Sequence, residues 1–250
     1  MLLRDKVIIV TGATSGIGEA TALEAARQGA KVVLAGRREE KGEALAERIR
    51  GEGGKALFVR TDVSVPADIE ALVARTLQAF ERLDGAFNNA GIPGPLGSLA
   101  DLPLDEYRKL MTVNLDSVLL CMQHQIRAMR KSGGGAIVNC ASILGMVGAQ
   151  TFGAYSTAKH ALVGLTKAAA LDYAAEGIRV NAVLPGPVET EIWSHVNQGD
   201  AVFAAFTSGV PMNRYARPEE IGRPVVFLLS DWSSYVTGTS LAIDGGYMIR

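Results

Sequence analysis

Residues 6–35 read KVIIVTGATSGIGEATALEAARQGAKVVLA. A β-branched run over residues 6–10 leads into a glycine-punctuated turn, and an alanine-rich stretch then continues until Gly29. This pattern predicts a buried strand, a tight loop and a helix. A second β-branched run follows at residues 31–35. A strand, a helix and a second strand within about 30 residues are typical of a parallel β-α-β unit, so this stretch predicts the α/β class.

The loop glycines Gly12, Gly16 and Gly18 have separate predicted roles. Gly12 permits the tight turn, Gly16 lets the main chain approach a pyrophosphate, and Gly18 lets the helix pack closely on the strand. The start of the helix would present free N–H groups to the anion. The spacing is GxxxGxG rather than GxGxxG. Its position between a strand and a helix is what favours dinucleotide binding over an ordinary glycine turn.

The end of the second strand predicts which dinucleotide is preferred. An acidic residue there would hold a ribose 2′-hydroxyl, whereas an arginine would accept a 2′-phosphate. The chain reads Ala35-Gly36-Arg37-Arg38, with no carboxylate before Glu39, and a planar guanidinium suits phosphate. We therefore expect NADP(H) as the favoured cofactor and NAD(H) as the alternative. In the competing interpretation, both arginines only solvate the start of the next helix.

Strands and helices continue to alternate along the rest of the chain. Further strands are expected at residues 55–59, 84–87, 136–141, 178–184 and 240–243, with helices at 39–50, 66–80, 102–131, from about 155 to Gly177, and 217–230. Asp62 and Val63 follow the third strand, at the edge where ligands gather in open α/β sheets. Asp62 would accept from an adenine amino group or simply cap a turn. Asn89 follows the fourth strand and would line a flat ligand or stabilise a tight turn.

The segment Tyr155-Ser-Thr-Ala-Lys159 carries the strongest chemical signal. On a helix, Tyr155 and Lys159 are i and i+4 neighbours on one face. A nearby cation lowers the pKa of a phenol from about 10 towards neutrality, where a general acid or base works best. Ser142, at the end of the fifth strand, would add a hydroxyl able to hold a carbonyl oxygen. An exposed helix with an incidental tyrosine and lysine is the alternative.

Taken in order, Thr11-Gly12-x-x-x-Gly16-x-Gly18, Asn88-Asn89-Ala90-Gly91, Asn114, Ser142, Tyr155-x-x-x-Lys159 and Pro185-Gly186 resemble the motifs of the short-chain dehydrogenase/reductase family. The resemblance covers essentially the whole chain and corresponds to the compact form of about 250 residues. It implies a single doubly wound Rossmann domain over residues 1–250, with a seven-stranded parallel sheet in the order 3-2-1-4-5-6-7 and helices on both faces. It also implies a homotetramer, and an enzyme that transfers a hydride between a nicotinamide cofactor and an alcohol/ketone pair.

The family roles carry over residue by residue. The resemblance implies that Tyr155 donates and accepts the proton and that Ser142 polarises the carbonyl. Lys159 would bind the nicotinamide ribose and lower the pKa of Tyr155, and Asn114 would hold a water that links Lys159 to solvent. The other implied cofactor contacts are Gly12, Thr14, Ser15, Gly16, Ile17 and Gly18 at the pyrophosphate, Asp62 and Val63 at the adenine, Asn89, Ala90 and Gly91 on the adenosine side, and Pro185, Gly186, Val188 and Thr190 at the nicotinamide.

One position departs from the family pattern. Many members that prefer NADP(H) carry a basic residue just before the second motif glycine, where this chain has Ser15. The prediction of a phosphate-binding site therefore depends on Arg37 and Arg38 alone.

Residues 189–215 mix apolar bulk with polar and glycine breaks. We expect a lid over the substrate pocket here, the alternative being surface helices used in oligomerisation. Met146, Gln150, Trp193 and Phe206 fall after the fifth strand or in this lid, and they favour a partly apolar alcohol or ketone as substrate.

Composition limits the remaining function classes. A net charge of -1 gives no electrostatic case for nucleic acid or an anionic membrane. No apolar run of about 18 residues is present, which indicates a cytoplasmic protein. Cys121 and Cys140 lie in apolar contexts without metal spacing, so we expect reduced thiols and no metal site. A non-catalytic dinucleotide sensor would be expected to lose Tyr155 or Lys159, and nucleotide-sugar epimerases have a longer C-terminal region.

Overall fold

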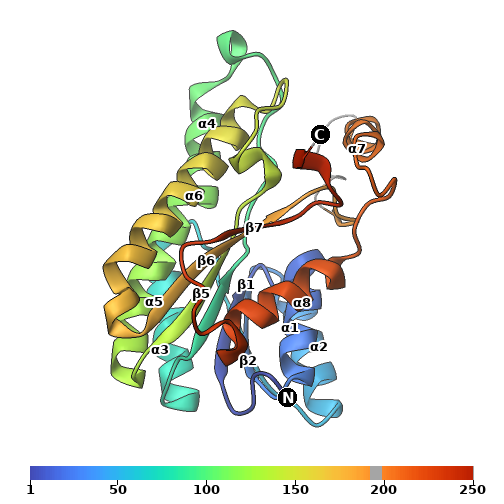
Figure 1. The fold of residues 1–250 in the computed structure, drawn as a ribbon. Coiled ribbons are helices and arrows are strands. Elements are labelled where there is room, and N and C mark those ends of the chain that lie inside the picture. Colours follow the sequence, from blue (N-terminus) through green and yellow to red (C-terminus); the bar gives the residue numbers. More distant parts are fainter. Residues whose placement is uncertain (192–198, 250) are drawn as a thin grey trace.

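The computed structural model describes residues 1–191 and 199–249, and within them seven parallel strands form one sheet (Figure 1). The strands are β1 Val7–Thr11, β2 Lys31–Gly36, β3 Lys55–Arg60, β4 Gly85–Asn88, β5 Gly135–Cys140, β6 Ile178–Pro185 and β7 Ser240–Ile243. Their spatial order is β3-β2-β1-β4-β5-β6-β7, which confirms the expected topology. Each strand begins and ends within one residue of the range that the apolar runs predict.

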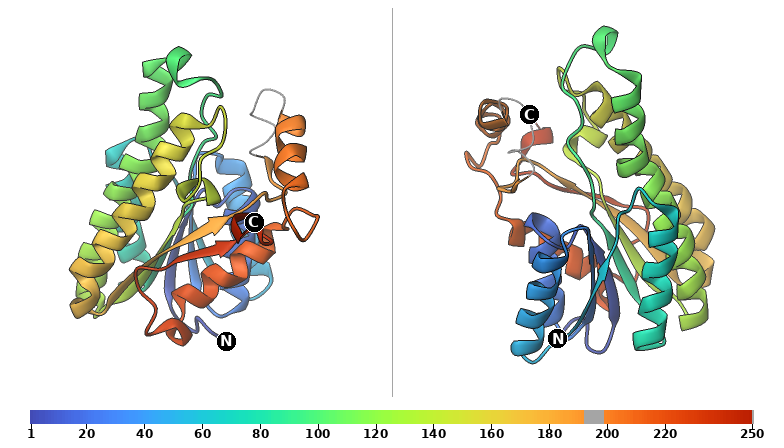
Figure 2. Two further views of the ribbon diagram at one scale, coloured as in Figure 1. Left: turned by 45° about the horizontal axis from the view of Figure 1, so that its top comes forward. Right: turned by 180° about the vertical axis from the view of Figure 1, so that it is seen from behind.

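Helices cover both faces of the sheet, as the two views of Figure 2 show. One face carries α1 Gly16–Arg27, α2 Glu39–Gly51 and α8 Pro218–Leu229, and the other carries α3 Pro66–Phe80, α5 Ser117–Ser132 and α6 Gly153–Tyr173. Alternate residues of β1 point to opposite faces, so Ile8 and Val10 pack in one apolar core and Val7 and Ile9 in the other. Because both faces are buried, the strand reads as a continuous apolar run.

The expected helix over residues 102–131 is interrupted. It consists of α4 Leu104–Met111, a π-helical turn Thr112–Asp116, and α5. A π turn inserts an extra residue into the helical ladder, which apolar periodicity does not reveal. Asn114 lies inside this turn.

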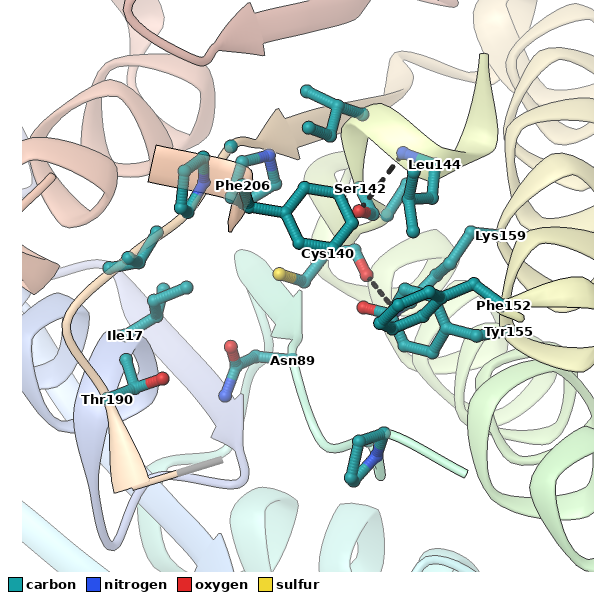
Figure 3. Close-up of a pocket in the computed structure, with 18 of the residues that line it drawn as sticks. Ile17, Asn89, Cys140, Ser142, Leu144, Phe152, Tyr155, Lys159, Thr190 and Phe206 are labelled. Atoms are coloured by element: carbon teal, nitrogen blue, oxygen red, sulfur yellow. Dashed lines mark hydrogen bonds between the residues drawn. The ribbon is translucent and has the colours of Figure 1, made fainter. Parts of the chain in front are cut away.

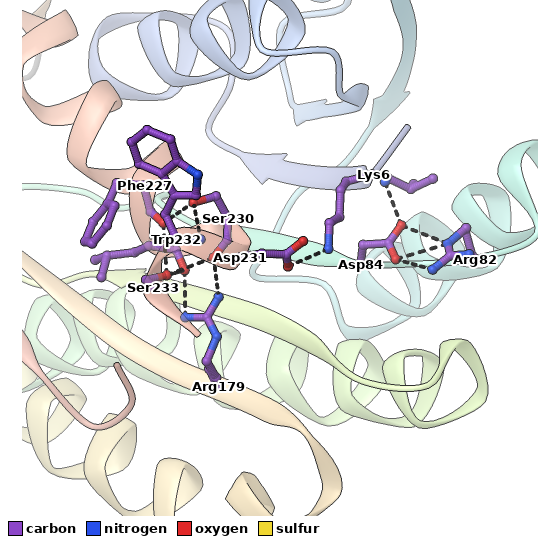
Figure 4. A network of polar contacts seen from close by, with 11 residues as sticks. Lys6, Arg82, Asp84, Arg179, Phe227, Ser230, Asp231, Trp232 and Ser233 are labelled. Carbon is purple, nitrogen blue, oxygen red and sulfur yellow. Dashed lines mark hydrogen bonds and ion pairs between the residues drawn. The ribbon is translucent and has the colours of Figure 1, made fainter. Parts of the chain in front are cut away.

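A polar network ties the amino-terminal edge of the sheet together (Figure 4). Arg179 on β6 donates to the main-chain oxygens of Leu228, Ser230 and Val236 at 2.9, 3.0 and 3.2 Å. Nearby, Asp84 accepts from the Val7 N–H at 2.8 Å. These contacts anchor the C-terminal part of the chain at the edge opposite the motifs described above.

Helix α7 Gly199–Ser208 stands apart from the other helices in Figure 1. Among the described residues, no helix is both long and apolar enough to cross a membrane.

Candidate active site

The candidate active site is a pocket at the carboxyl ends of β4, β5 and β6 (Figure 3). Parallel strands deliver the residues that follow them to this edge, which is why motifs far apart in the sequence meet here. The predicted site residues that line it are Ile17, Asn89, Gly91, Ser142, Tyr155, Lys159, Pro185, Gly186, Val188 and Thr190. The other predicted site residues are described and lie outside this lining: Gly12, Thr14, Ser15, Gly16, Gly18, Arg37, Arg38, Asp62, Val63, Ala90 and Asn114.

Tyr155 and Lys159 lie one turn apart on α6, as expected. The Lys159 ammonium is 5.4 Å from the centre of the Tyr155 ring. It donates to the Cys140 main-chain oxygen at 2.7 Å. Lys159 is only 5% exposed, and a buried ammonium must be hydrogen-bonded. The lysine is therefore held in the site by the end of β5, not by solvent.

The pKa values in this pocket are governed by burial. Burial raises the pKa of Tyr155 above its usual 10, the adjacent Cys140 thiol raises it further, and a hydrogen bond with Ser142 acts in the opposite sense. Burial also lowers the pKa of Lys159. Burial therefore acts on both groups in the coenzyme-free pocket, and the expected lowering of the pKa of Tyr155 by Lys159 stays a prediction.

Ser142 is placed by the turn that follows β5. Its backbone is extended, and its hydroxyl accepts from the Leu144 N–H at 3.2 Å, which caps the short helix Ile143–Gly145. The same side chain bonds to Tyr155. These two hydroxyls lie in a pocket that is also lined by the polar side chains of Asn89, Lys159 and Thr190.

Asn114 forms a structural bridge. Its Oδ1 accepts from the Ile92 N–H and its Nδ2 donates to the Ile92 oxygen, both at 2.8 Å. The side chain is 1% exposed, so the expectation that a buried amide must be hydrogen-bonded is confirmed. The bridge holds the segment after β4 against the π turn. A water relay through Asn114 stays a prediction.

The glycine loop fits a pyrophosphate. Gly12 has a φ of 64°, a left-handed conformation that favours glycine. A Cβ on Gly18 would overlap the Gly12 oxygen and the Asn89 side chain, which confirms the expected close approach of helix and strand. The helix α1 has no side-chain cap at Ser15, so its first N–H groups face the loop and remain available to an anion.

The two open alternatives at Asn89 and Asp62 both resolve toward local structure. The Asn89 Nδ2 donates to the oxygens of Thr11 and Gly12 at 3.1 and 3.3 Å, which stabilises the glycine loop. Asp62 accepts from the Ser64 N–H and hydroxyl at 2.9 and 2.7 Å, which caps a turn and lowers the pKa of Asp62. Asn89 and Asp62 still lie at the carboxyl ends of the strands, and their contacts with the cofactor stay predictions.

Arg38 points back over the glycine loop. Its guanidinium donates to the hydroxyls of Thr14 and Ser15 at 3.1 and 2.6 Å and pairs with Glu191 at 2.9 Å. Arg37 lies 3.9 Å from Asp62 and is largely exposed. Both arginines lie at the end of β2, where a 2′-phosphate is expected, and their binding of a phosphate stays a prediction.

The substrate end of the pocket is aromatic. The Phe152 ring lies edge-on to Tyr155 and to Phe206 of α7, with centroid distances of 6.5 and 5.4 Å. Phe206 also contacts Tyr247 near the C-terminus, at 6.1 Å. In Figure 3, Phe206 and Leu144 close one side of the pocket, and Ile17 and Thr190 lie at its other end.

The sequence predicted the substrate end only in part. Phe206 lines the pocket as expected, whereas Met146 and Gln150 are exposed and lie outside its lining. Trp193 and residues 192–198 of the expected lid lie outside the described residues, so the lid stays a prediction. Phe152 was missed, because it lies just before the start of α6 and outside the helical repeat that places Tyr155.

Known proteins resemble this chain in sequence and in structure. Residues 12–248 match the family model described as enoyl-(acyl carrier protein) reductase. The chain is 46% identical over 247 residues to a 2,5-dichloro-2,5-cyclohexadiene-1,4-diol dehydrogenase of Sphingobium indicum, with 98% of each chain covered. The chain belongs to the short-chain dehydrogenase/reductase family.

Two further comparisons extend this result. A cyclohexanol dehydrogenase of Acinetobacter sp. is 41% identical over 243 residues, with 97% of this chain and 95% of the relative covered. A Beutenbergia cavernae protein solved with bound NADP at low occupancy has a TM-score of 0.92 and 38% identity, with 99% of this chain and 98% of the other covered. This short-chain dehydrogenase/reductase is accordingly an NAD(P)-dependent oxidoreductase that acts on CH–OH or C=O groups. Among the described residues, no group of His, Cys, Asp or Glu could hold a metal ion.

Proposed function

We propose that this protein interconverts a six-membered carbocyclic secondary alcohol and its ketone, with NADP(H) as the preferred coenzyme. The observation that carries the proposal is the pair of hydroxyls of Ser142 and Tyr155 facing a pocket walled by aromatic rings. Phe152 and Phe206 meet edge to face at an interplanar angle of 84°, a wall suited to a compact apolar ring. Two of the relatives named above act on six-membered rings.

The residues of the pocket fit this chemistry. When bound, the nicotinamide coenzyme supplies or accepts the hydride. In the reductive direction, the Tyr155 hydroxyl donates its proton to the substrate oxygen, and the Ser142 hydroxyl holds that oxygen in place. Tyr155 carries this proton because burial keeps its phenol protonated. In the oxidative direction the phenol must first have lost its own proton, and the Tyr155 phenolate then accepts the proton of the alcohol.

Lys159 has two parts in the proposal. Its ammonium is fixed by the Cys140 oxygen and lies beside Tyr155, where it would hold a ribose hydroxyl. As a buried cation, it would also stabilise the phenolate that forms when Tyr155 gives up its proton. Burial raises the pKa of Tyr155, whereas Lys159 would lower it. A titration of the Tyr155 phenol tests which of the two effects is larger.

Substrate class is tested by turnover of cyclohexanol and cyclohexanone against linear 2-hexanol and 2-hexanone, which have the same carbon number and functional group. We expect kcat/KM to be about tenfold higher for the ring compounds, a difference of about 1.4 kcal/mol. The Phe206→Ala variant should reduce this preference, because it removes one aromatic wall. Equal kcat/KM for ring and linear compounds would overturn the proposed substrate class while leaving the reaction type in place.

Coenzyme preference is tested by fluorescence titration with NADPH and NADH. We expect the wild type to bind NADPH at least tenfold more tightly, about 1.4 kcal/mol, and Arg37→Ala/Arg38→Ala to lose this preference. Equal or tighter NADH binding in the wild type would show that the arginines do not clamp a phosphate. The cytoplasmic location and the homotetramer remain part of this proposal, and size-exclusion chromatography with light scattering tests the latter.

A further inference from the structure

Three cations and two carboxylates gather near the end of β2. Glu191, which follows the segment after β6, pairs through one oxygen with Arg38 at 2.9 Å and through the other with Lys41 at 3.3 Å. Arg37 faces Asp62 at 3.9 Å on the other side. Arg38 and Glu191 are 153 residues apart in the sequence, so this contact joins two separate segments across the cofactor edge.

The geometry of Arg38 is fixed from its other side. Its Nε and Nη2 atoms donate to the Thr14 and Ser15 hydroxyls, which leaves Nη1 for Glu191. The glycine loop thus holds the guanidinium in position, and the Glu191 carboxylate accepts the hydrogen bond from its third nitrogen. A phosphate group prefers the same planar, charge-assisted contacts.

Glu191 is held close to the loop by its neighbours. Val188 forms a bridge with Ala216, and the Glu189 N–H donates to the Ala216 oxygen at 3.0 Å. The methyl group of Thr190 lies close to Gly16 of the glycine loop. The segment that leads to Glu191 is therefore held by Ala216 and lies against Gly16 at the start of α1.

We propose that Glu191 determines coenzyme specificity by competing with the 2′-phosphate of NADP(H) for Arg38 and Lys41. NADPH must displace or approach this carboxylate, whereas the 2′-hydroxyl of NADH leaves both ion pairs intact. A phosphate carries a charge of about -1.5 to -2 at neutral pH, so the carboxylate also repels it. The inference rests on the proposed dinucleotide function and on the position of the 2′-phosphate near Arg38.

The test is titration of NADPH and NADH into wild type, Glu191→Gln and Glu189→Gln. Glu189→Gln removes the same charge two residues away, and among the described residues the Glu189 side chain makes no ion pair. We expect Glu191→Gln to tighten NADPH binding about five- to tenfold, as expected for loss of a competing ion pair. NADH binding should change less than twofold, and Glu189→Gln should leave both constants within twofold.

A mutant cycle assigns the effect to the two cations that pair with Glu191. In the Arg38→Ala/Lys41→Ala background, Glu191→Gln should no longer tighten NADPH binding, because both shared cations are gone. Equal shifts for NADPH and NADH, an equal effect of Glu189→Gln, or an unchanged NADPH constant in Glu191→Gln would each overturn the inference. If the wild type binds neither coenzyme, the proposed function itself fails; if it binds both and only the Glu191→Gln ratio is unchanged, the failure is confined to Glu191.

Discussion

Tyr155 is the residue on which the proposed proton transfer depends. Its hydroxyl bonds to Ser142, and the ring packs against Phe152 in a buried wall. Tyr155→Phe removes the transferable proton and keeps the ring. We expect turnover to fall by roughly 10²- to 10⁴-fold, with the coenzyme dissociation constant within twofold of the wild type. Steady-state kinetics and fluorescence titration measure the two quantities, and retained turnover would contradict the mechanism.

The protonation of Tyr155 gives a second prediction at this scale. Burial raises the pKa of its phenol above the usual 10, so in the coenzyme-free protein it stays protonated through neutral and moderately alkaline pH. The stability that it contributes is fully present below pH 10 and is lost as the pH rises through the higher folded value. An ultraviolet difference titration of wild type minus Tyr155→Phe isolates this phenol. A titration near pH 7 without coenzyme would show that Lys159 outweighs burial.

At the scale of elements, the start of α8 is held by Glu220. Its carboxylate accepts from the Arg217 N–H at 2.9 Å and pairs with Arg214 at 2.8 Å. These contacts lower the pKa of Glu220 to about 2, the largest cause being the hydrogen bond from Arg214. They connect the start of the helix to the segment that follows α7.

Glu220→Gln should lower the free energy of unfolding by about 1 kcal/mol at neutral pH, as expected for a lost helix cap. The control is Glu219→Gln, which removes the same charge from the same helical turn without either contact. Because the pKa of Glu220 falls from 4.5 to about 2 on folding, its contribution is present above pH 4.5 and is lost as the pH falls toward 2. Urea denaturation at several pH values measures both effects, and a constant difference between wild type and Glu220→Gln down to pH 2 would rule out this role.

At the scale of the whole molecule, Arg179 connects the sheet to the C-terminal third of the chain. The guanidinium is partly buried, burial lowers its pKa, and three main-chain oxygens accept from it. Arg179→Met removes this charged donor, although Ser233 and Asn181 still donate to the three oxygens. We therefore expect a loss of about 1.5 to 3 kcal/mol in the free energy of unfolding, the net contribution of hydrogen bonds from a charged group. The control is Arg223→Met on the exposed side of α8. Urea denaturation measures the loss, and coenzyme affinity should stay within twofold because the network lies at the opposite edge.

The fold could be predicted because its signals are local. Each buried strand is a short apolar run between turns, and the glycine loop and the Tyr155 segment fall at strand ends that the runs define. The site was less predictable where contacts join distant segments. Two such contacts are the ion pair between Arg38 and Glu191 and the aromatic contact between Phe152 and Phe206. Each joins segments that are far apart in the sequence, so no periodic sequence pattern predicts it. The position of the Lys159 ammonium likewise depends on the Cys140 oxygen, which only the folded sheet supplies.

The position of β7 affects when the active site can form during synthesis of the chain. β7 pairs with β6, and the Gly186 N–H beside the pocket donates to the Ile243 oxygen at 3.0 Å. The loop that would face the nicotinamide is therefore secured by residues that are synthesised after all the site motifs. A domain folds as a unit during synthesis, so a nascent chain that already carries the glycine loop, Ser142 and Tyr155 still lacks this support. Catalytic competence should begin only after β7 has left the ribosome and paired with β6.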